Sequence, residues 1–214
     1  MNTAAGSRAK LLACAAAVVV AAGIGAGAAR ADDELLTCGG ETEQVFAQFG
    51  DYAQYRLVPG GDFEAASGWG LSGGARFVAG NETFNVGGGG AHSLSLPAGS
   101  SATSPVTCLG TTDPTLRFFA LETGASSGSL QVEALFRTVL GILPVKLRIA
   151  TVDGTAVWAP SQTIVNLSSV LGSLSLDLKA GVQFRFTPKS GFLAPASFRI
   201  DDVYVDPFGL GNSG

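Results

Sequence analysis

Apolar side chains occupy alternate positions in the stretch Leu130-Gln131-Val132-Glu133-Ala134-Leu135-Phe136. Because successive side chains of a β-strand point to opposite faces, this period of two places the apolar set on one face and Gln131 and Glu133 on the other. Antiparallel sheets commonly pack one such face on the core and leave the other in solvent. The stretch therefore predicts a half-buried β-strand.

The same alternation recurs along the chain. Four further segments show it: 116–120, 145–149, 174–178 and 182–186. Turn residues such as Asp153-Gly154 and Ala180-Gly181 separate these segments. The 214 residues include 30 glycines, and no segment beyond residue 31 keeps a helical period for three turns. Many short strands at even spacing predict an all-β fold, either a sandwich or a barrel.

The strand predicted at 198–205 breaks its own alternation. Phe198 and Ile200 share one face by parity, whereas the apolar set resumes one step out of phase at Val203. A β-bulge at Asp201-Asp202 would restore the pattern. Some bulges are purely structural, and others direct a side chain into a functional site. The sequence is consistent with either role here.

The first 31 residues have the features of a secretory signal peptide. Arg8 and Lys10 precede an uncharged run at 11–29, and the sequence Ala29-Arg30-Ala31 places the cut before Asp32. The run is rich in Ala and Gly, which are weakly hydrophobic for a membrane span of roughly 20 residues. We expect cleavage and a secreted chain without a membrane contact; an uncleaved N-terminal anchor is the alternative.

Two cysteines remain after this cut, Cys38 and Cys108. An even pair in an exported chain favours one disulfide, which the chain-entropy model credits with on the order of 4 kcal/mol for so long a loop. Two free thiols are the alternative. His92 is the only histidine, and no Cys-x-x-Cys spacing occurs, so the usual zinc sites are excluded.

The charge of the chain argues against a nucleic-acid partner. Removal of residues 1–31 takes away three basic residues and no acidic one, which leaves ten basic and seventeen acidic residues. The basic residues are scattered singly along the sequence. Nucleic-acid binding requires a clustered positive field, and an anionic membrane surface is disfavoured for the same reason.

Two distant segments resemble the ends of galactose-binding-like jelly-roll domains. The segment 57–64, Leu-Val-Pro-Gly-Gly-Asp-Phe-Glu, followed by Gly68-Trp69, is similar to the "N-G-x-F-E…W" opening of several carbohydrate-binding modules. The segment 198–205 is similar to their closing "aromatic-x-I-D-D-V-x-V" strand. The resemblance covers roughly residues 55 to 206 and is nearest to exported bacterial proteins of similar length. It implies a two-sheet antiparallel β-sandwich of the jelly-roll type.

This resemblance divides the chain into four parts. They are a signal peptide at 1–31, an N-terminal extension with Cys38 at 32–54, the β-sandwich domain at 55–206 and a flexible tail at 207–214.

The resemblance also implies a structural calcium ion. In these domains the opening Glu and a closing Asp hold Ca²⁺ with the help of backbone carbonyls, which here implies Glu64 with Asp201 or Asp202. Calcium takes six to eight oxygen ligands, so carboxylates from both ends of a domain suit it. The alternative is that these carboxylates are solvated or paired with Arg199.

The sugar sites of this family usually present aromatic rings, and the sequence departs from that pattern. Of the two tryptophans, Trp69 occupies a position that normally fills the core. Trp158 lies at a strand end, where its ring is either exposed as a platform for a sugar or buried in the core. Polar side chains on outward strand faces offer another grip on a polar or acidic ligand: Arg117, Gln131, Glu133, Arg148, Gln183, Arg185 and Arg199. A solvated sheet face is the ordinary alternative. The candidate ligand-binding residues are Trp158, Arg117, Arg148 and Arg185.

Catalytic motifs are weak. The Gly-x-Ser-x-Gly matches at 70–74 and 124–128 lack the preceding buried strand and following helix of a nucleophile elbow. No carboxylate pair of the glycosidase type stands out. The sequence predicts no enzyme, but a secreted ligand-binding module with a glycan as the first candidate ligand. The alternative is an extracellular structural or adhesion protein that contacts an envelope protein through the apolar segments 139–144 and 170–174.

Overall fold

The computed structural model describes residues 41–65, 68–107, 115–124, 128–137, 144–164, 181–191 and 195–206. All of them belong to one compact unit, Leu35–Gly214. Cys38 and Cys108, the predicted signal peptide and the tail at 207–214 lie outside the described residues, so the disulfide, the cleavage and the tail stay predictions. No helix among the described residues is long and apolar enough to cross a membrane.

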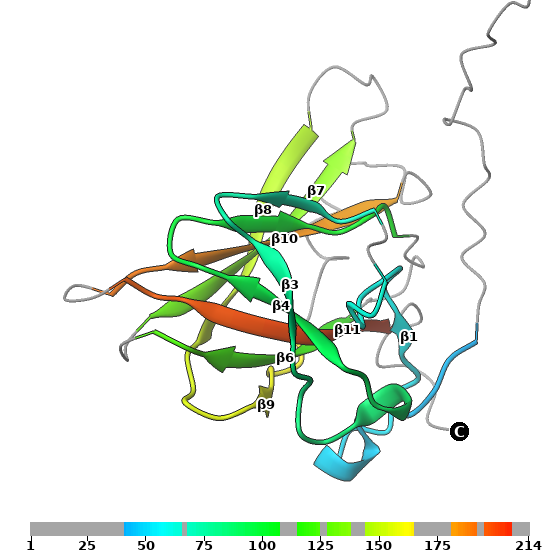
Figure 1. The fold of residues 1–214 in the computed structure, drawn as a ribbon. Helices are drawn as coiled ribbons and strands as arrows, with labels where there is room; N and C mark the ends of the chain where they lie inside the picture. Colours follow the sequence, from blue (N-terminus) through cyan, green and yellow to red (C-terminus); the bar gives the residue numbers. More distant parts are fainter. Residues whose placement is uncertain are drawn as a thin grey trace, which may run out of the picture. The chain divides into compact units, whose positions relative to one another are not determined.

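The described strands form two antiparallel sheets (Figure 1). The six-stranded sheet has the order β3 (Arg76–Ala79), β4 (His92–Leu96), β11 (Phe198–Asp206), β6 (Thr115–Glu122) and β9 (Ala159–Pro160), with β1 (Arg56–Leu57) also paired to β11. The five-stranded sheet has the order β2 (Gly70–Ser72), β5 (Ser101–Thr103), β10 (Val182–Lys189), β7 (Ser129–Arg137) and β8 (Pro144–Asp153). Two short 3₁₀ turns, η1 (Ala47–Phe49) and η2 (Val86–Gly88), are the only helical elements in the described part.

One apolar core lies between the two sheets. It contains Leu94, Phe118 and Phe198 from the six-stranded sheet, and Leu130 and Phe184 from the five-stranded sheet. Trp69 is buried in the same core, and its indole Nε1 donates to the carbonyl of Pro59 at 3.1 Å. The predicted two-sheet antiparallel β-sandwich is therefore confirmed.

Alternation predicted burial correctly in β7 and β10 and incorrectly in β6. In β10 the buried side chains alternate with half-exposed ones, which leaves one face of the strand accessible. In β6 every residue from Thr115 to Ala120 is buried, including Arg117 and Phe119, which parity had placed on an outward face. The difference arises because another part of the chain covers the outer face of the six-stranded sheet.

Residues 43–57 and Trp158 provide that cover. Phe46, which is 0% exposed, stacks on Phe119 with ring centroids 5.6 Å apart and meets the edge of Tyr55 at 4.9 Å. These rings form a second, smaller core with Val86 and Tyr204. The described residues ahead of β1 thus pack on the sandwich, and their one helical element is the single turn η1.

A β-bulge interrupts β11 where the sequence placed it. The pairing of β11 with β6 shifts register between Asp201 and Tyr204, and Asp202 has a left-handed backbone with φ of 48°. On the other side of β11, β4 pairs with residues before the bulge and β1 with residues after it. The bulge therefore lies where the opening and closing segments of the domain meet.

Candidate functional site

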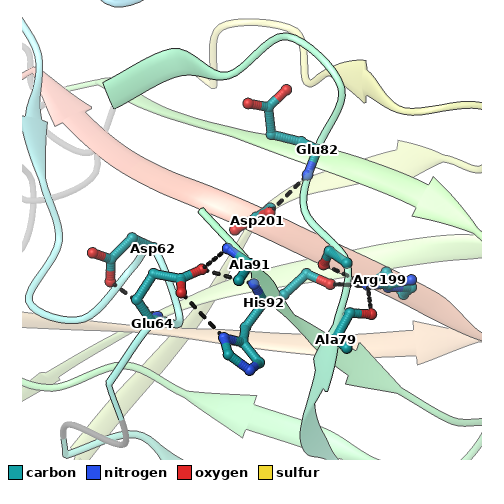
Figure 2. Close-up of polar contacts among 10 residues, drawn as sticks. Asp62, Glu64, Ala79, Glu82, Ala91, His92, Arg199 and Asp201 are labelled. Atoms are coloured by element: carbon teal, nitrogen blue, oxygen red, sulfur yellow. Dashed lines mark hydrogen bonds and ion pairs between the residues drawn. The ribbon is translucent and has the colours of Figure 1, made fainter. Parts of the chain in front are cut away.

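Carboxylates gather at the bulge. Asp201 is 0% exposed and accepts hydrogen bonds from the backbone N–H of Glu82 (2.9 Å) and of Asp202 (3.0 Å). When the amide of Asn81 is oriented to match donors to acceptors, its nitrogen also donates to Asp201, at 2.8 Å. Figure 2 shows the carboxylate of Glu82 turned away from Asp201 while its backbone N–H faces it. That carboxylate instead accepts from the N–H groups of Phe84 and Val86 and so holds η2.

Glu64 is bound to the start of β4. Its Oε1 accepts from the backbone N–H groups of Ala91 (2.6 Å) and His92 (2.7 Å), and its Oε2 lies 3.1 Å from His92 Nδ1 (Figure 2). These hydrogen bonds, with that of His92 first, lower the pKa of Glu64. A Cβ at Gly90 would lie 2.4 Å from Glu64 Oε1, so only glycine leaves room for this contact.

Asp202 is the unsatisfied member of the cluster. It is 5% exposed, its Oδ2 is buried without an N–H donor, and its carboxyl group lies within hydrogen-bond reach of the carboxyl group of Glu82. Burial, followed by the charge of Asp201 and then of Glu82, raises the pKa of Asp202 to about 8. Burial also raises the pKa of Asp201 to about 7, against the lowering effect of its backbone hydrogen bonds. An unpaired carboxylate oxygen among like charges would be stabilised by a cation.

The predicted calcium ligands are therefore not equivalent. Glu64 and Asp201 direct their oxygens at N–H donors, whereas Asp202 offers a buried oxygen with no protein donor. Within the described ranges, no group of three or more His, Cys, Asp or Glu side chains is arranged to hold a metal ion. The side chains present fit a hard cation at Asp202, with carbonyls or water as its other ligands, better than a cation shared with Glu64. Arg199 does not pair with these acids, because its guanidinium donates to Ser93 and to the carbonyl of Ala79.

The four candidate ligand-binding residues do not share one surface. Arg117 lies under the cover of the six-stranded sheet, donates to Asp51 at 2.7 Å and to the carbonyl of Ser161, and lies 4.4 Å from the Phe46 ring centroid. Burial alone would raise the pKa of Asp51, but hydrogen bonds from Tyr55, Ala53 and Arg117 lower it. Arg117 therefore has a structural environment and no access to a ligand.

Trp158 is half-buried at the margin of the second core, with the Arg199 guanidinium 5.7 Å from its ring centroid. Trp158 therefore fills the edge of the second core and stays partly exposed. Of the two tyrosines in the N-terminal cover, Tyr55 is buried and Tyr52 is exposed.

Arg148 and Arg185 share the outer face of the five-stranded sheet. We call this surface the polar face. Its described side chains project away from the core: Ser72, Ser101, Thr103, Ser129, Gln131, Glu133, Leu135, Lys146, Arg148, Thr151, Asp153, Gln183, Arg185, Thr187 and Lys189. Across four neighbouring strands, Thr103 pairs with Arg185, Arg185 with Glu133, and Glu133 with Arg148. Leu135 is the one apolar side chain among the described residues of the face.

A pocket of about 240 Å³ adjoins one end of the polar face. It lies between β8 and β9, the edge strands of the two sheets, and its polar lining includes Thr151, Asp153 and Gln162. Pockets for drug-sized ligands usually measure about 300–1,000 Å³, so this one suits a single small group. An extended ligand would not fit inside it.

Sequence reasoning missed three residues that build these sites. Asp51 fixes Arg117, Glu82 holds η2 and donates to Asp201, and Asn81 bonds to Asp201. Glu82 and Asn81 lie 119 or more residues from Asp201, Asp51 lies in the N-terminal cover, and nothing in their local pattern marks them. The break in phase at Asp201-Asp202 was the available signal, and it pointed to the right place.

The comparisons with known proteins concern the fold. The sequence matches no protein-family model and no curated protein. Among solved structures, the CBM22-1–GH10 modules of Clostridium thermocellum endo-1,4-β-D-xylanase 10B, complexed with xylohexaose, are similar at 17% identity and a TM-score of 0.50. The match covers 75% of this chain and 29% of that one, so this chain spans less than a third of the xylanase structure.

Two further structures are similar at lower scores. The CBM22-1 xylan-binding domain of Paenibacillus barcinonensis Xyn10C has 11% identity over 81% of this chain and 99% of its own, with a TM-score of 0.48. TmCBM61, in complex with β-1,4-galactotriose, has 16% identity over 70% of this chain and 97% of its own, with a TM-score of 0.41. All three structures contain carbohydrate-binding modules. The described part of this chain shares the jelly-roll β-sandwich fold with the first of them.

Proposed function

We propose that this chain is a non-catalytic carbohydrate-binding module that acts outside the cytoplasm, at the cell envelope or beyond it. The observation that carries the proposal is the fold shared with a xylanase structure in which a module of this type accompanies a bound xylan oligosaccharide. The signal peptide expected at 1–31 supports the location. A fold alone does not fix a ligand, so the site must be argued from its own chemistry.

The polar face is the proposed binding surface. It offers donors and acceptors in register across four strands: Thr103 extends the row formed by Arg185, Glu133 and Arg148, and Thr187 and Thr151 lie in the next row with Gln131. Sugar hydroxyls are both donors and acceptors, and charged partners make the stronger hydrogen bonds. An outward sheet face of this kind suits an extended glycan that lies across the strands.

The environments of the possible catalytic groups favour binding over catalysis. Ser72 Oγ lies 2.8 Å from Ser101 Oγ, and His92 Nδ1 is directed to Glu64. Serine catalysis requires a base in hydrogen-bond contact with the nucleophile. Ser72 and His92 are each committed to another partner, so they do not form such a pair.

We also propose that the module holds a structural Ca²⁺ ion, with Asp202 as its main side-chain ligand. The buried oxygen of Asp202 and the surrounding carboxylates support the proposal. A bound cation would offset their repulsion and fasten the bulge of β11 to the loop that carries Glu82. The alternative function, adhesion to an envelope protein through 139–144 and 170–174, depends on segments that lie almost wholly outside the described residues, and it stays a prediction.

Affinity electrophoresis tests the binding proposal. The exported protein is run through native gels that contain one polysaccharide each, from a set of neutral and acidic plant and cell-wall glycans. Retardation by at least one glycan, relative to a non-binding reference protein, is the expected result. Equal mobility in every gel would contradict the proposal.

A further inference from the structure

We infer that the polar face selects a polysaccharide that carries carboxylate groups over neutral glycans. The inference rests on the proposed function, because it names the class of glycan that the same surface would take. Three observations carry it. They are the positive charges on the face, the lack of hydrogen bonds from its two arginines to described residues, and the lack of aromatic side chains among its described residues.

The centre of the polar face is locally cationic in a chain whose formal net charge is −4. Lys146, Arg148 and Arg185 surround a single carboxylate, Glu133. No ion pair joins Glu133 to any of these cations among the described residues. Among the described residues, the centre of the face therefore carries an excess of positive charge, and such fields attract anions.

The arginines of this face differ from the other arginines whose contacts the structure defines. Arg117 and Arg199 donate to carbonyl, hydroxyl or carboxylate oxygens of the protein itself. Arg185 has a buried Nε without a partner, and neither Arg148 nor Arg185 forms a hydrogen bond within the described ranges. A guanidinium fork matches a carboxylate in two parallel hydrogen bonds, which a neutral sugar hydroxyl cannot do.

The described residues of this surface offer no ring for stacking. No aromatic side chain occurs among the described residues of the polar face. A neutral glycan would then be held by hydrogen bonds that mostly replace those it makes with water, and each contributes little net free energy. Charge-assisted hydrogen bonds supply what stacking does not.

The strand register also fixes the distance between the two arginines of the face. Arg185 and Arg148 lie on either side of Glu133, two strand intervals or about 10 Å apart. This is roughly the length of a disaccharide, so the two arginines suit carboxylates on alternate sugars of an extended chain. Glu133 between them repels a carboxylate placed midway and accepts hydroxyl hydrogens instead.

The test uses the exported protein and soluble oligomers of galacturonic, glucuronic and mannuronic acid. Each oligomer is paired with its carboxyl-reduced counterpart, which has the same linkages and no charge. We expect at least one uronic-acid oligomer to bind about tenfold or more tightly than its reduced form, because hydrogen bonds to charged groups are the stronger ones. We also expect this binding to weaken in high salt, which screens exposed charges.

Three variants test whether the preference for the acidic oligomer depends on the polar face. Replacing both Arg148 and Arg185 by Ala removes the preference for the acidic oligomer. Arg76→Ala, which removes an exposed arginine from β3 of the other sheet, leaves it intact. Glu133→Gln strengthens binding to the acidic oligomer, because it removes the one carboxylate of the row.

The outcomes separate the inference from the proposed function. Equal binding of acidic and reduced oligomers, or preference for neutral glycans, overturns the carboxylate inference and leaves carbohydrate binding in place. Equal competition by single-stranded DNA also overturns it, because the surface would then attract any polyanion. Failure to bind any glycan, charged or neutral, overturns both.

Discussion

Arg117 on β6 donates from Nη1 to Oδ2 of Asp51, 2.7 Å away, and the two side chains are only 8% and 18% exposed. The pair joins the segment ahead of β1 to the middle of the six-stranded sheet. Phe46 packs on the same guanidinium at 4.4 Å. The middle of the outer face of this sheet is thus closed by a salt bridge and an aromatic cluster, whereas the outer face of the five-stranded sheet is accessible along its described residues.

Arg117→Ala should destabilise the fold. It leaves the carboxylate of Asp51 largely buried without its cation, and breaking a buried ion pair from one side lowers the free energy of unfolding by about 3 kcal/mol or more. Urea unfolding measures the loss. Arg76→Ala, the exposed control, should change the value by less than about 0.5 kcal/mol. Equal effects of the two substitutions would refute a structural role for the ion pair.

The N-terminal cover should be part of the folded unit. Phe46→Ala removes a fully buried ring that contacts Phe119 and Tyr55, and such truncations lower the free energy of unfolding by about 3–5 kcal/mol. Tyr52→Ala is the matched control, since Tyr52 lies in the same segment and is 67% exposed. A thermal melt of both variants decides the matter. If Phe46→Ala melts with the wild-type protein, the segment does not stabilise the sandwich.

The stability of the calcium-free protein should fall as the pH rises from about 5 to about 8. Burial raises the pKa of Asp201 to about 7 and that of Asp202 to about 8, from an ordinary value of 3.8. Between these values the folded chain binds more protons than the unfolded chain, so raising the pH favours unfolding. Asp51 and Glu64 have lowered pKa values, and their stabilising contribution is already complete in this range.

Melting temperatures recorded in EDTA across this pH range test the sign. Asp202→Asn should flatten the dependence, because it removes the group with the higher pKa. A melting temperature that rises with pH in EDTA would show that the buried carboxylates are not held in their protonated form.

Calcium should act through Asp202 more than through Glu64. Excess Ca²⁺ added after EDTA should raise the melting temperature at pH 8, and Asp202→Asn should abolish the increase. Glu64→Gln should preserve most of it, because the oxygens of Glu64 already accept from Ala91 and His92. An unchanged melting temperature in the wild-type protein would rule out the calcium proposal, and a loss in both variants would restore Glu64 as a ligand.

The sequence predicted the sandwich well because its evidence was local. The period of two in β7 and β10 and the break in phase at Asp201-Asp202 are properties of neighbouring residues, and both have their counterparts in the structure. Parity tells which residues of a strand share a face. It does not tell which outer face a distant segment will cover.

That limit explains the errors at the candidate site. Arg117 and Arg185 show the same alternation in the sequence, yet one is closed in by residues 43–57 and the other faces outward. Glu82 was missed because its contact with Asp201 joins residues 119 positions apart in the chain.

The most direct test of the central claim is a calorimetric titration of the exported protein with the glycan that retards it most in native gels. The wild-type protein should bind saturably, and replacing Arg148 and Arg185 by Ala together should weaken binding about tenfold or more without changing the melting temperature. Arg76→Ala should bind as the wild type does. Absence of binding to every glycan, or undiminished binding by the double variant, would contradict the assignment of the polar face as a carbohydrate-binding surface.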